Sequence, residues 1–423
     1  MKIPGHTSLD RISSLSVEDK QRLAGLWVES AEELLSLAAA IDDAKRRDVL
    51  GISAENLTRF RGTVAGLIGE GRARDLQRVT VKRALGCILD DETTSTLKAG
   101  NPLTPERKKA PFAFEKELPG QVRLLPGLGP VKDQGQRGAC VAFASAALRE
   151  YLEGGQEQLS EQFLYWACKE LDGVPSEGTT LHTAMAALAE YGVCRALTWP
   201  YNPVPDMWNE GQGPPPMSAL SEAKEYQLHD CRPVESTLVD HYKHMLAGED
   251  GQPGMPVVFG IPVYHESFFN AETERTGKIF VPLPGFSLIG GHAMCAVGYV
   301  DDKEVPGGGY FIVRNSWGPD WAAENPEAPG HGLLPYVYLA QFGIEAFTGP
   351  TSHQQLTGSG PRIAESLSEI CAACGKPFVT VIDRIGVCME EGCAKDICNN
   401  CWTVKKVHRC RAHQRNRKAI HKD

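Results

Sequence analysis

No run of the chain approaches the ~20 consecutive apolar residues that a helix needs to cross a bilayer. The opening stretch, Met1-Lys-Ile-Pro-Gly-His-Thr-Ser8, also lacks the apolar core of a secretory signal. These absences argue against a membrane-spanning or secreted class, and we expect a cytoplasmic protein with no membrane partner. The hydrophobic content of 42% is that of an ordinary globular protein. The length of 423 residues predicts about two or three domains.

An overall excess of basic charge is also lacking. The formal net charge is -9, which argues against nucleic-acid binding along the whole chain. From Thr403 to Asp423, however, eight Lys or Arg residues and one acid give a local charge of +7, so the remainder carries -16. Such a tail is more often solvated than bound to nucleic acid, which is therefore the less favoured partner. Seven of the eight are the candidates for such binding: Lys405, Lys406, Arg409, Arg411, Arg415, Arg417 and Lys418.

Cysteine is sparse until residue 371, and then seven of the thirteen cysteines follow within forty positions. Clustered cysteines in a chain without a secretory signal favour metal binding over disulfides, and a reducing compartment. With one histidine they form four ligand pairs, two of which have the Cys-x-x-Cys spacing, and this pattern predicts two structural zinc ions. The pairs are Cys371 and Cys374, Cys388 and Cys393, Cys398 and Cys401, and Cys410 and His413.

The order of these pairs resembles the cross-braced zinc modules of the B-box and RING type. The resemblance implies that the first and third pairs hold one zinc, and the second and fourth the other. So small a unit has little apolar core, so the metal is expected to supply its folding energy. We expect this module, residues 371–413, to bind a protein partner. A linker at 351–370 precedes it, and a basic tail at 414–423 follows.

The first 90 residues are expected to form an all-α module. Ser16-Val-Glu-Asp19 and Ser30-Ala-Glu-Glu33 have the form of capping boxes, and Ser53 begins a third apolar helical stripe. The module weakly resembles tandem helix-hairpin-helix repeats, which would imply a docking function. A plain helical domain, or a pro-segment that covers a cleft, is the alternative. Residues 91–117, polar and broken by prolines, are expected to be a linker.

The stretch from Val131 to Ala144 carries the strongest chemical signal. Two glycines, Gly135 and Gly138, allow sharp turns, and Cys140 then opens an apolar run that reads as a buried helix ending at a glycine pair. A cysteine at a helix N-terminus is favoured as the thiolate, which is a nucleophile. The alternative for any cysteine is a buried structural thiol. That alternative is expected for Cys87, Cys168, Cys194, Cys231 and Cys295.

Two later segments supply candidate partners for this thiol. His292 stands at the start of a predicted strand of small and apolar residues, and Asn315 ends the next predicted strand, followed by Ser-Trp-Gly. The rival histidines, His182 and His265, lack a following strand of this kind. Helices therefore come first and strands second, which is the α+β pattern of two packed units.

Residues 118–348 resemble the papain-like cysteine peptidases. The resemblance lies in the order of Gln134, Cys140, His292 and Asn315-Ser-Trp-Gly and in the residues next to them. The resemblance implies a two-lobed α+β domain at 118–350, with a helical lobe and a β-barrel-like lobe. It implies Cys140 as nucleophile, His292 as acid and base, and Asn315 as the residue that orients the imidazole. Gln134 and the Cys140 N–H would bind the oxyanion. Trp317 would shield the Asn–His hydrogen bond, and Gly178 would lend backbone groups to the substrate.

Three features depart from the family pattern. Arg137 stands where secreted members carry a disulfide cysteine, Val141 replaces a tryptophan, and an acidic, proline-rich insertion follows Asp320. We therefore expect a cytoplasmic enzyme, with bacterial-style composition, that hydrolyses peptide bonds in protein or peptide substrates through a thioester. Two alternatives remain open. The domain is a vestigial scaffold that works through the zinc module, or it passes the acyl group to an amine as a transpeptidase or isopeptidase.

Overall fold

The structure is a computed structural model that describes residues 3, 5–78, 80, 83–99, 103, 118–248 and 253–350. Beyond residue 350 it describes four short strands, which pair as two hairpins. These are β8 (Ser368–Ile370) with β9 (Pro377–Val379), and β10 (Gly386–Val387) with β11 (Asp396–Ile397). The eight predicted zinc ligands lie outside the described residues. In the described part of the chain, no helix has both the length and the apolar character of a transmembrane span.

The N-terminal module is helical, and its predicted helix starts are confirmed. Ser16 and Asp19 form a capping box, as do Ser30 and Glu33, and the Ser53 hydroxyl accepts a hydrogen bond from the Asn56 N–H. The elements are η1 (Leu9–Arg11), α1 (Val17–Gly25), α2 (Ala31–Ala40), α3 (Asp43–Leu50), α4 (Ala54–Ile68) and α5 (Glu70–Asp75).

The expected linker at 91–117 is wrong in its first part, because residues Asp91–Lys98 form the helix α6. The Asp90 side chain caps it by accepting a hydrogen bond from the Thr93 N–H, and Leu97 is buried against the core. An aspartate cap and one buried leucine therefore outweigh the polar composition that had indicated a linker.

Helices form one lobe of the second unit. The predicted helix that begins at Cys140 is present, and two more follow at Glu161 and Leu181. They are α7 (Cys140–Leu152), α8 (Glu161–Asp172), α9 (Leu181–Glu190) and α10 (Met217–Ala223), with the 3-10 turns η2 (Leu125–Gly127) and η3 (Lys224–Tyr226). Residues 203–216 form a surface loop, with Met207 and Trp208 exposed.

A seven-stranded antiparallel sheet forms the other lobe, with the order β2-β7-β3-β4-β5-β6 and β1 paired to β4. Its strands are β1 (Gln121–Arg123), β2 (Arg232–Pro233), β3 (Val257–Tyr264), β4 (Leu288–Asp301), β5 (Gly309–Arg314), β6 (His331–Pro335) and β7 (Ala346–Thr348). Four helices accompany it: α11 (Val239–Ala247), α12 (His265–Phe268), α13 (Ala271–Thr276) and α14 (Tyr336–Phe342).

Two apolar segments of this lobe do not continue as strands. Residues 277–281 make only an isolated bridge between Lys278 and Leu333. The apolar run that begins at Leu333 ends its strand at Pro335, and the helix α14 follows. Proline has no N–H to continue the ladder, and it is tolerated just before the first helical turn, so it divides strand from helix here.

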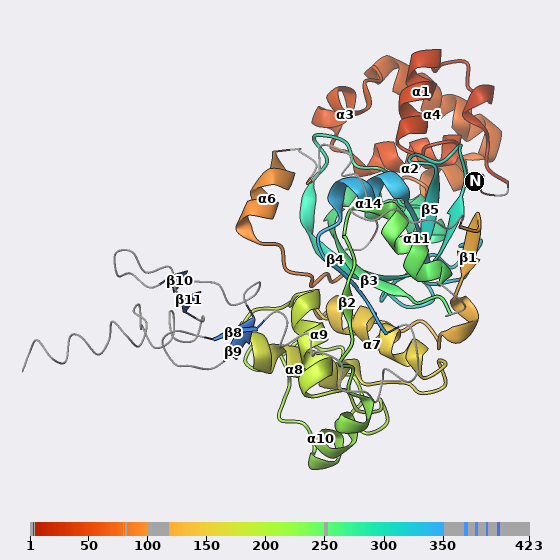
Figure 1. Cartoon of the computed structure of the whole chain (residues 1–423). Coiled ribbons are helices and arrows are strands. Elements are labelled where there is room, and N and C mark those ends of the chain that lie inside the picture. The colour runs from red at the N-terminus through yellow and green to blue at the C-terminus, as the bar shows by residue number, and fades with distance from the viewer. Residues whose placement is uncertain are drawn as a thin grey trace, which may run out of the picture.

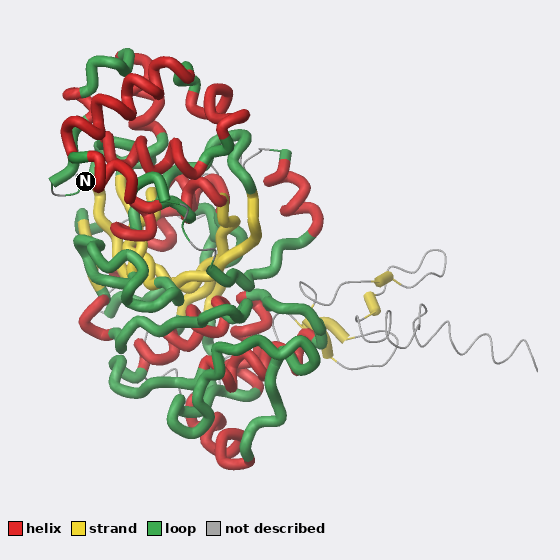
Figure 2. The backbone as a smooth tube through the Cα atoms, turned by 180° about the vertical axis from the view of Figure 1, so that it is seen from behind, coloured by secondary structure: helices red, strands yellow, loops and turns green. Residues whose placement is uncertain are grey.

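The sheet lies between the two groups of helices (Figure 1). Helices α1–α4 cover one side and α7–α10 the opposite side, and the view from behind shows the same three layers (Figure 2). Strand β3 explains why both sides are apolar. Val257 and Phe259 point into the cluster shared with the N-terminal helices, whereas Val258 packs with α7–α9. A strand buried on both faces reads as a continuous apolar run.

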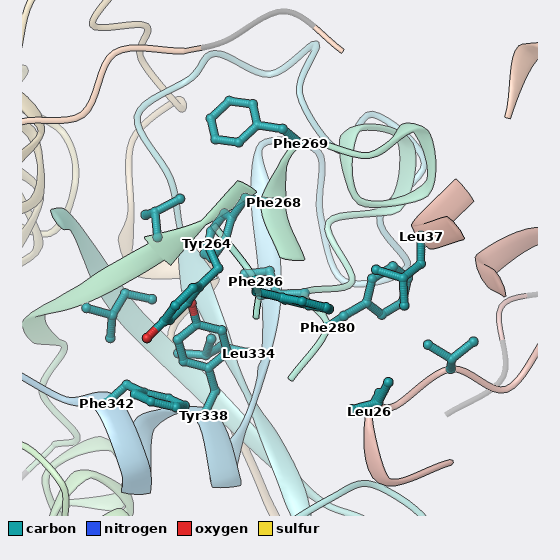
Figure 3. Packing of buried hydrophobic residues seen from close by; sticks show 14 of the residues in the cluster. Leu26, Leu37, Tyr264, Phe268, Phe269, Phe280, Phe286, Leu334, Tyr338 and Phe342 are labelled. Carbon is teal, nitrogen blue, oxygen red and sulfur yellow. The ribbon is translucent and has the colours of Figure 1, made fainter. Parts of the chain in front are cut away.

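The N-terminal module and the sheet share one hydrophobic cluster (Figure 3). Leu26 and Leu37 of the module lie in it with Phe280, Phe286 and other buried residues of the sheet lobe. Because burial of a leucine-sized side chain stabilises by roughly 1.5–3 kcal/mol, this shared cluster joins the two units firmly.

A buried ion pair adds to this contact. The Lys278 ammonium lies 2.8 Å from both Glu29 Oε2 and Glu33 Oε1, and 4.8 Å from the centre of the Trp27 ring. Lys278 and Glu33 are almost completely buried. The carboxylates come from the module and the ammonium from the sheet lobe, so this interaction spans the junction.

Replacing Lys278 by methionine should therefore destabilise the chain by about 3 kcal/mol, because it leaves two carboxylates near the junction without their cation. Urea unfolding followed by circular dichroism measures the change. The matched control is Arg59→Ala, which removes an exposed ion pair with Glu55 on α4 and should cost about 0.5 kcal/mol or less. Equal effects of the two substitutions would contradict the assigned role of Lys278.

Candidate active site

Cys140 is the first residue of α7, and it follows a tight loop. Gly135 has a φ of +61°, a conformation that favours glycine, and its N–H donates to Asp133 Oδ1 at 2.8 Å. The Cys140 side chain is fully buried. The predicted helix start is therefore confirmed, with the sulfur at the positive end of the helix.

His292 and Asn315 reach the same place from two neighbouring strands. His292 Nε2 lies 2.8 Å from Asn315 Oδ1, and the N–H of Ala293 donates to Cys140 Sγ at 3.3 Å. That second contact brings β4 directly against the sulfur, and His292 is the fifth residue of this strand, not its first as predicted. Within the described part of the chain, His292 Nδ1 is buried without a hydrogen-bond partner. With Nε2 engaged by the carboxamide, Nδ1 is the nitrogen left to exchange a proton.

Trp317 covers the imidazole. Its ring stacks on the His292 ring with centroids 4.7 Å apart and an interplanar angle of 25°, and it is almost fully buried. Its indole N–H donates to the Ala84 carbonyl at 3.1 Å. An apolar ring in this position excludes water from the hydrogen bond between His292 and Asn315, which strengthens it.

Gln134 is held at both ends of its side chain. Its Oε1 accepts a hydrogen bond from the Ser316 hydroxyl at 2.6 Å, and its Nε2 donates to the Arg137 carbonyl at 2.8 Å. The same Nε2 also lies 3.4 Å from the carbonyl oxygen of Leu85. The amide thus meets a peptide carbonyl that belongs to another part of the chain.

That carbonyl belongs to residues 83–88, here called the occupying segment, which lie across the site. On the sheet side, the Gly291 carbonyl accepts hydrogen bonds from the N–H groups of Gly86 and Cys87, at 3.3 and 3.2 Å. Arg83 forms an ion pair with Glu274, which anchors the start of the segment. The segment leaves the N-terminal module and binds directly beside His292.

The occupying segment also pairs with the helical lobe. The Thr179 N–H donates to the Gly86 carbonyl at 2.9 Å, and the Ile88 N–H donates to the Thr179 carbonyl at 3.0 Å. The segment is therefore hydrogen-bonded to both lobes at once, as an extended peptide would be in a groove between them.

Glycines allow this close approach. A Cβ placed on Gly86 would lie 2.0 Å from the Gly138 carbonyl oxygen, and one placed on Gly178 would lie 2.8 Å from the Gly86 oxygen. Both contacts are with backbone atoms, which cannot move aside as a flexible side chain can. Three glycines from three segments thus let the main chains pack without side chains between them.

The charge state of the site differs from the thiolate expected at a helix N-terminus. Burial raises the pKa of Cys140 to about 12, although the backbone N–H groups around the sulfur act in the opposite direction. Burial also lowers the pKa of His292 to about 4, opposed by its hydrogen bond to Asn315. In this conformation the pair is a neutral thiol and a neutral imidazole, because the occupying segment keeps water out.

The remaining site predictions can be placed as well. The Gly178 N–H bonds to the Tyr165 hydroxyl, and its carbonyl accepts from Lys169, so the backbone that pairs with the occupying segment is that of Thr179. A substrate role for Gly178 stays a prediction. The rival histidines contact phenylalanine rings instead: His182 meets Phe347, and His265 stacks on Phe269.

The five cysteines expected to be structural are all free and buried. One of them, Cys87, lies in the occupying segment and not in a core helix or strand. Thr179 and Ser316 were not singled out from the sequence. The only local signal for the segment is the short apolar run Ala84-Leu-Gly-Cys-Ile-Leu89, which follows the last helix of the module.

Comparison with known proteins gives a consistent result. The family described as papain family cysteine protease matches residues 123–325. An uncharacterized peptidase C1-like protein of Acanthamoeba polyphaga mimivirus is 29% identical over 273 residues, which are 61% of this chain and 79% of the viral protein. Cathepsin J of Mus musculus is 28% identical over 198 residues, 45% of this chain, and the match spans only about half (54%) of that relative.

Among solved structures, xylellain, a cysteine protease from Xylella fastidiosa, is 26% identical with a TM-score of 0.48. That match covers 64% of this chain and 99% of xylellain. The family match covers the segments that carry Gln134, Cys140, His292 and Asn315, which the fold brings together at one site. The chain therefore contains a papain-family cysteine peptidase domain, and with it the chain is a hydrolase of the peptidase class.

Proposed function

We propose that this chain is a cysteine endopeptidase in which Cys140 attacks the peptide carbonyl. His292 takes the thiol proton and later gives it to the leaving amine, while Asn315 holds the imidazole in the required tautomer. A thioester forms between Cys140 and the acyl part of the substrate, and water then hydrolyses it. The observation that carries the proposal is the convergence of the sulfur, the free Nδ1 of His292 and the Asn315 carboxamide.

The Gln134 amide supports the same role. Its Nε2 already lies 3.4 Å from a peptide carbonyl oxygen, that of Leu85, beside the nucleophile. A substrate carbonyl in this position would receive the same donor as its oxygen becomes negative. Removal of one such donor typically costs a factor of about 10²–10³ in rate.

The described conformation is the latent form of this enzyme. The occupying segment fills the site from both sides, and Cys140 is inaccessible to solvent. A substrate needs the same backbone partners, so the segment has to leave before a peptide can bind. The N-terminal module then acts as a pro-segment, whether or not it is removed by cleavage.

Product analysis separates hydrolysis from acyl transfer, which the same groups would also perform. We expect casein cleavage in H₂¹⁸O to place one ¹⁸O atom in each new C-terminal carboxylate, since water breaks the thioester. An added amine such as glycinamide should appear in few products. Mass spectrometry measures both, and a majority of amide products would identify a transpeptidase instead. Loss of cleavage in a chain without Cys140 is the direct test of the peptidase itself.

The C-terminal cysteine cluster is proposed to bind two structural zinc ions and to recruit a protein substrate or partner. Its eight ligands lie outside the described residues, so support comes from the spacing of the pairs alone. A cytoplasmic location fits free cysteines and zinc-bound thiolates, and it too is a proposal. Nucleic-acid binding by the basic tail is less favoured, and a vestigial scaffold role is opposed by the assembled site.

The full-length chain should contain two zinc ions per molecule, measured by inductively coupled plasma mass spectrometry. In the cross-braced arrangement Cys371→Ser with Cys398→Ser damages one site only, so one zinc should remain. The matched pair Cys371→Ser with Cys410→Ser damages both sites and should leave less than half a zinc. Equal zinc contents in the two double variants would exclude this pairing of ligands.

A further inference from the structure

Arg137 is a buried cation in the middle of the loop that precedes Cys140. It has no exposed surface, and its guanidinium donates to Gln162 Oε1, the Asn202 carbonyl and the Glu210 carbonyl, each at 2.8 Å. A buried charge is costly unless it is paired and hydrogen-bonded. So fixed a guanidinium ties the loop to two other segments of the helical lobe.

Two tyrosine rings flank the guanidinium, at 5.1 Å for Tyr165 and 5.2 Å for Tyr201. Arg137, Tyr165, Tyr201 and Glu210 are called the Arg137 cluster below. Each tyrosine hydroxyl continues from the cluster to a different part of the active site. The cluster therefore contacts the active site in two places.

The first of these contacts is with the proposed oxyanion donor, Gln134. The Arg137 carbonyl accepts from Gln134 Nε2 at 2.8 Å, and the Tyr201 hydroxyl donates to the Gln134 carbonyl at 2.9 Å. Both the side chain and the main chain of Gln134 are thus hydrogen-bonded to residues of the cluster. If the Arg137 side chain loses its anchors, the carbonyl that orients the Gln134 amide is free to move.

The second contact is with the backbone that pairs with an extended peptide. The Tyr165 hydroxyl donates to Glu210 Oε1 at 2.8 Å and accepts from the Gly178 N–H at 3.0 Å. The next residue, Thr179, makes the two backbone hydrogen bonds between the helical lobe and the occupying segment. The cluster therefore fixes the position of the wall against which a peptide main chain would lie.

We propose that Arg137 is a positioning residue that sets the oxyanion donor Gln134 and the peptide-pairing backbone of Thr179 in register with each other. It touches neither the sulfur nor a bound peptide, so its effect passes through Gln134 and Thr179. This assignment rests on the proposed peptidase function. Its consequence is selective: reactions that need the oxyanion donor or the Thr179 backbone depend on Arg137, whereas simple chemistry at the sulfur does not.

The experiment compares two reagents on the full-length chain with Gly86→Leu, a substitution that displaces the occupying segment. Iodoacetamide alkylates Cys140 and needs only an accessible thiolate. The tripeptide aldehyde acetyl-leucyl-leucyl-norleucinal also needs the Gln134 amide and the Thr179 backbone in their correct positions. The carbonyl carbon of the aldehyde bonds to the sulfur, and the thiol proton ends on the aldehyde oxygen. That oxygen then lies beside the Gln134 amide and accepts a hydrogen bond from it.

In this background Arg137→Met should raise the inhibition constant of the aldehyde at least about tenfold and change the alkylation rate less than about twofold. Tyr165→Phe, which removes only the hydroxyl between Gly178 and Glu210, should raise KM for casein peptides about fivefold with little change in kcat. The matched control is Arg195→Met, which removes a half-exposed guanidinium paired with Glu222 and should change neither value.

Equal changes in aldehyde inhibition and alkylation would overturn the assignment, because they would show a general structural role. So would an Arg137→Met chain that keeps the aldehyde affinity of the control. If Arg137→Met does not fold, Arg137→Lys and Tyr165→Phe decide by the same ratio of the two reagents. A Gly86→Leu chain with alkylated Cys140 but no aldehyde inhibition or casein cleavage would instead count against the proposed peptidase function.

Discussion

Replacing Gly86 by leucine in the full-length chain is expected to raise the rate of Cys140 alkylation by iodoacetamide about 100-fold. A Cβ on Gly86 would lie 2.0 Å from the Gly138 carbonyl oxygen, so the occupying segment cannot keep its place in the site. Alkylation of a buried thiol proceeds through the fraction of molecules in which the segment has left. A clash that shifts this equilibrium by ~2.7 kcal/mol changes that fraction about 100-fold.

The pH dependence of the same reaction gives an independent reading. In the closed form burial holds the pKa of Cys140 at about 12, so thiolate reactivity should keep rising through pH 10. Once the segment leaves, water reaches the sulfur, and its pKa falls toward or below the ordinary value at this helix N-terminus. The rate for Gly86→Leu should therefore level off at a lower pH than the rate for the parent chain.

The control is Gly71→Leu, which places the same side chain on α5 of the same module, where nothing lies within 4 Å of a Cβ. It should leave both the rate and its pH profile unchanged. Fast alkylation of the parent chain, equal to that of Gly86→Leu, would show that the occupying segment does not block the site.

The sequence was sufficient to name the three side chains, Cys140, His292 and Asn315, that the fold brings together at one site. Short-range features point to each of them: a glycine turn before a helix for Cys140, a run of small and apolar strand residues around His292, and a strand end for Asn315. These features depend on local backbone rules that act over a few residues. The resemblance to a known family then supplied the long-range information that local rules lack, namely that the three segments meet.

The occupying segment could not be predicted in the same way. Its four main-chain hydrogen bonds with Gly291 and Thr179 can be made by any sequence, so they leave no signal in the residues. Only the glycine at position 86 is specific, and its meaning is visible only once Gly138 and Gly178 lie opposite. The neutral thiol follows from this packing as well, because burial by a distant segment outweighs the helix N-terminus.

Arg137 is a second feature whose role could not be predicted from the sequence. Its position before the nucleophile drew attention to it, as a departure from the family pattern. Its partners are two main-chain carbonyls, a glutamine and two tyrosine rings from segments up to 73 residues away. A buried cation that bonds to carbonyl groups leaves no pattern of paired charges in the sequence, so the structure was needed to assign it a role.

In the Gly86→Leu chain, replacing Cys140 by alanine is expected to reduce casein cleavage by at least about 10⁴-fold. The sulfur is the atom that we propose forms the acyl-enzyme bond, and loss of a nucleophile in such a set removes nearly all of its rate enhancement. Release of fluorescent peptides from fluorescein-labelled casein measures the rate. Asn315→Ala should reduce the rate less, by about 10²-fold, because the imidazole stays in place without its orienting carboxamide.

The matched control is Cys295→Ala, because Cys295 is equally buried and lies on the same strand as His292. It removes a sulfur near the site without touching the Cys–His–Asn contacts, so activity should stay within about threefold of the parent. If Cys140→Ala kept a tenth or more of the cleavage while Cys295→Ala kept all of it, another group would have to be the nucleophile. The contact between the Ala293 N–H and Cys140 Sγ would then describe a structural thiol, and the convergence of the three side chains would have no catalytic meaning.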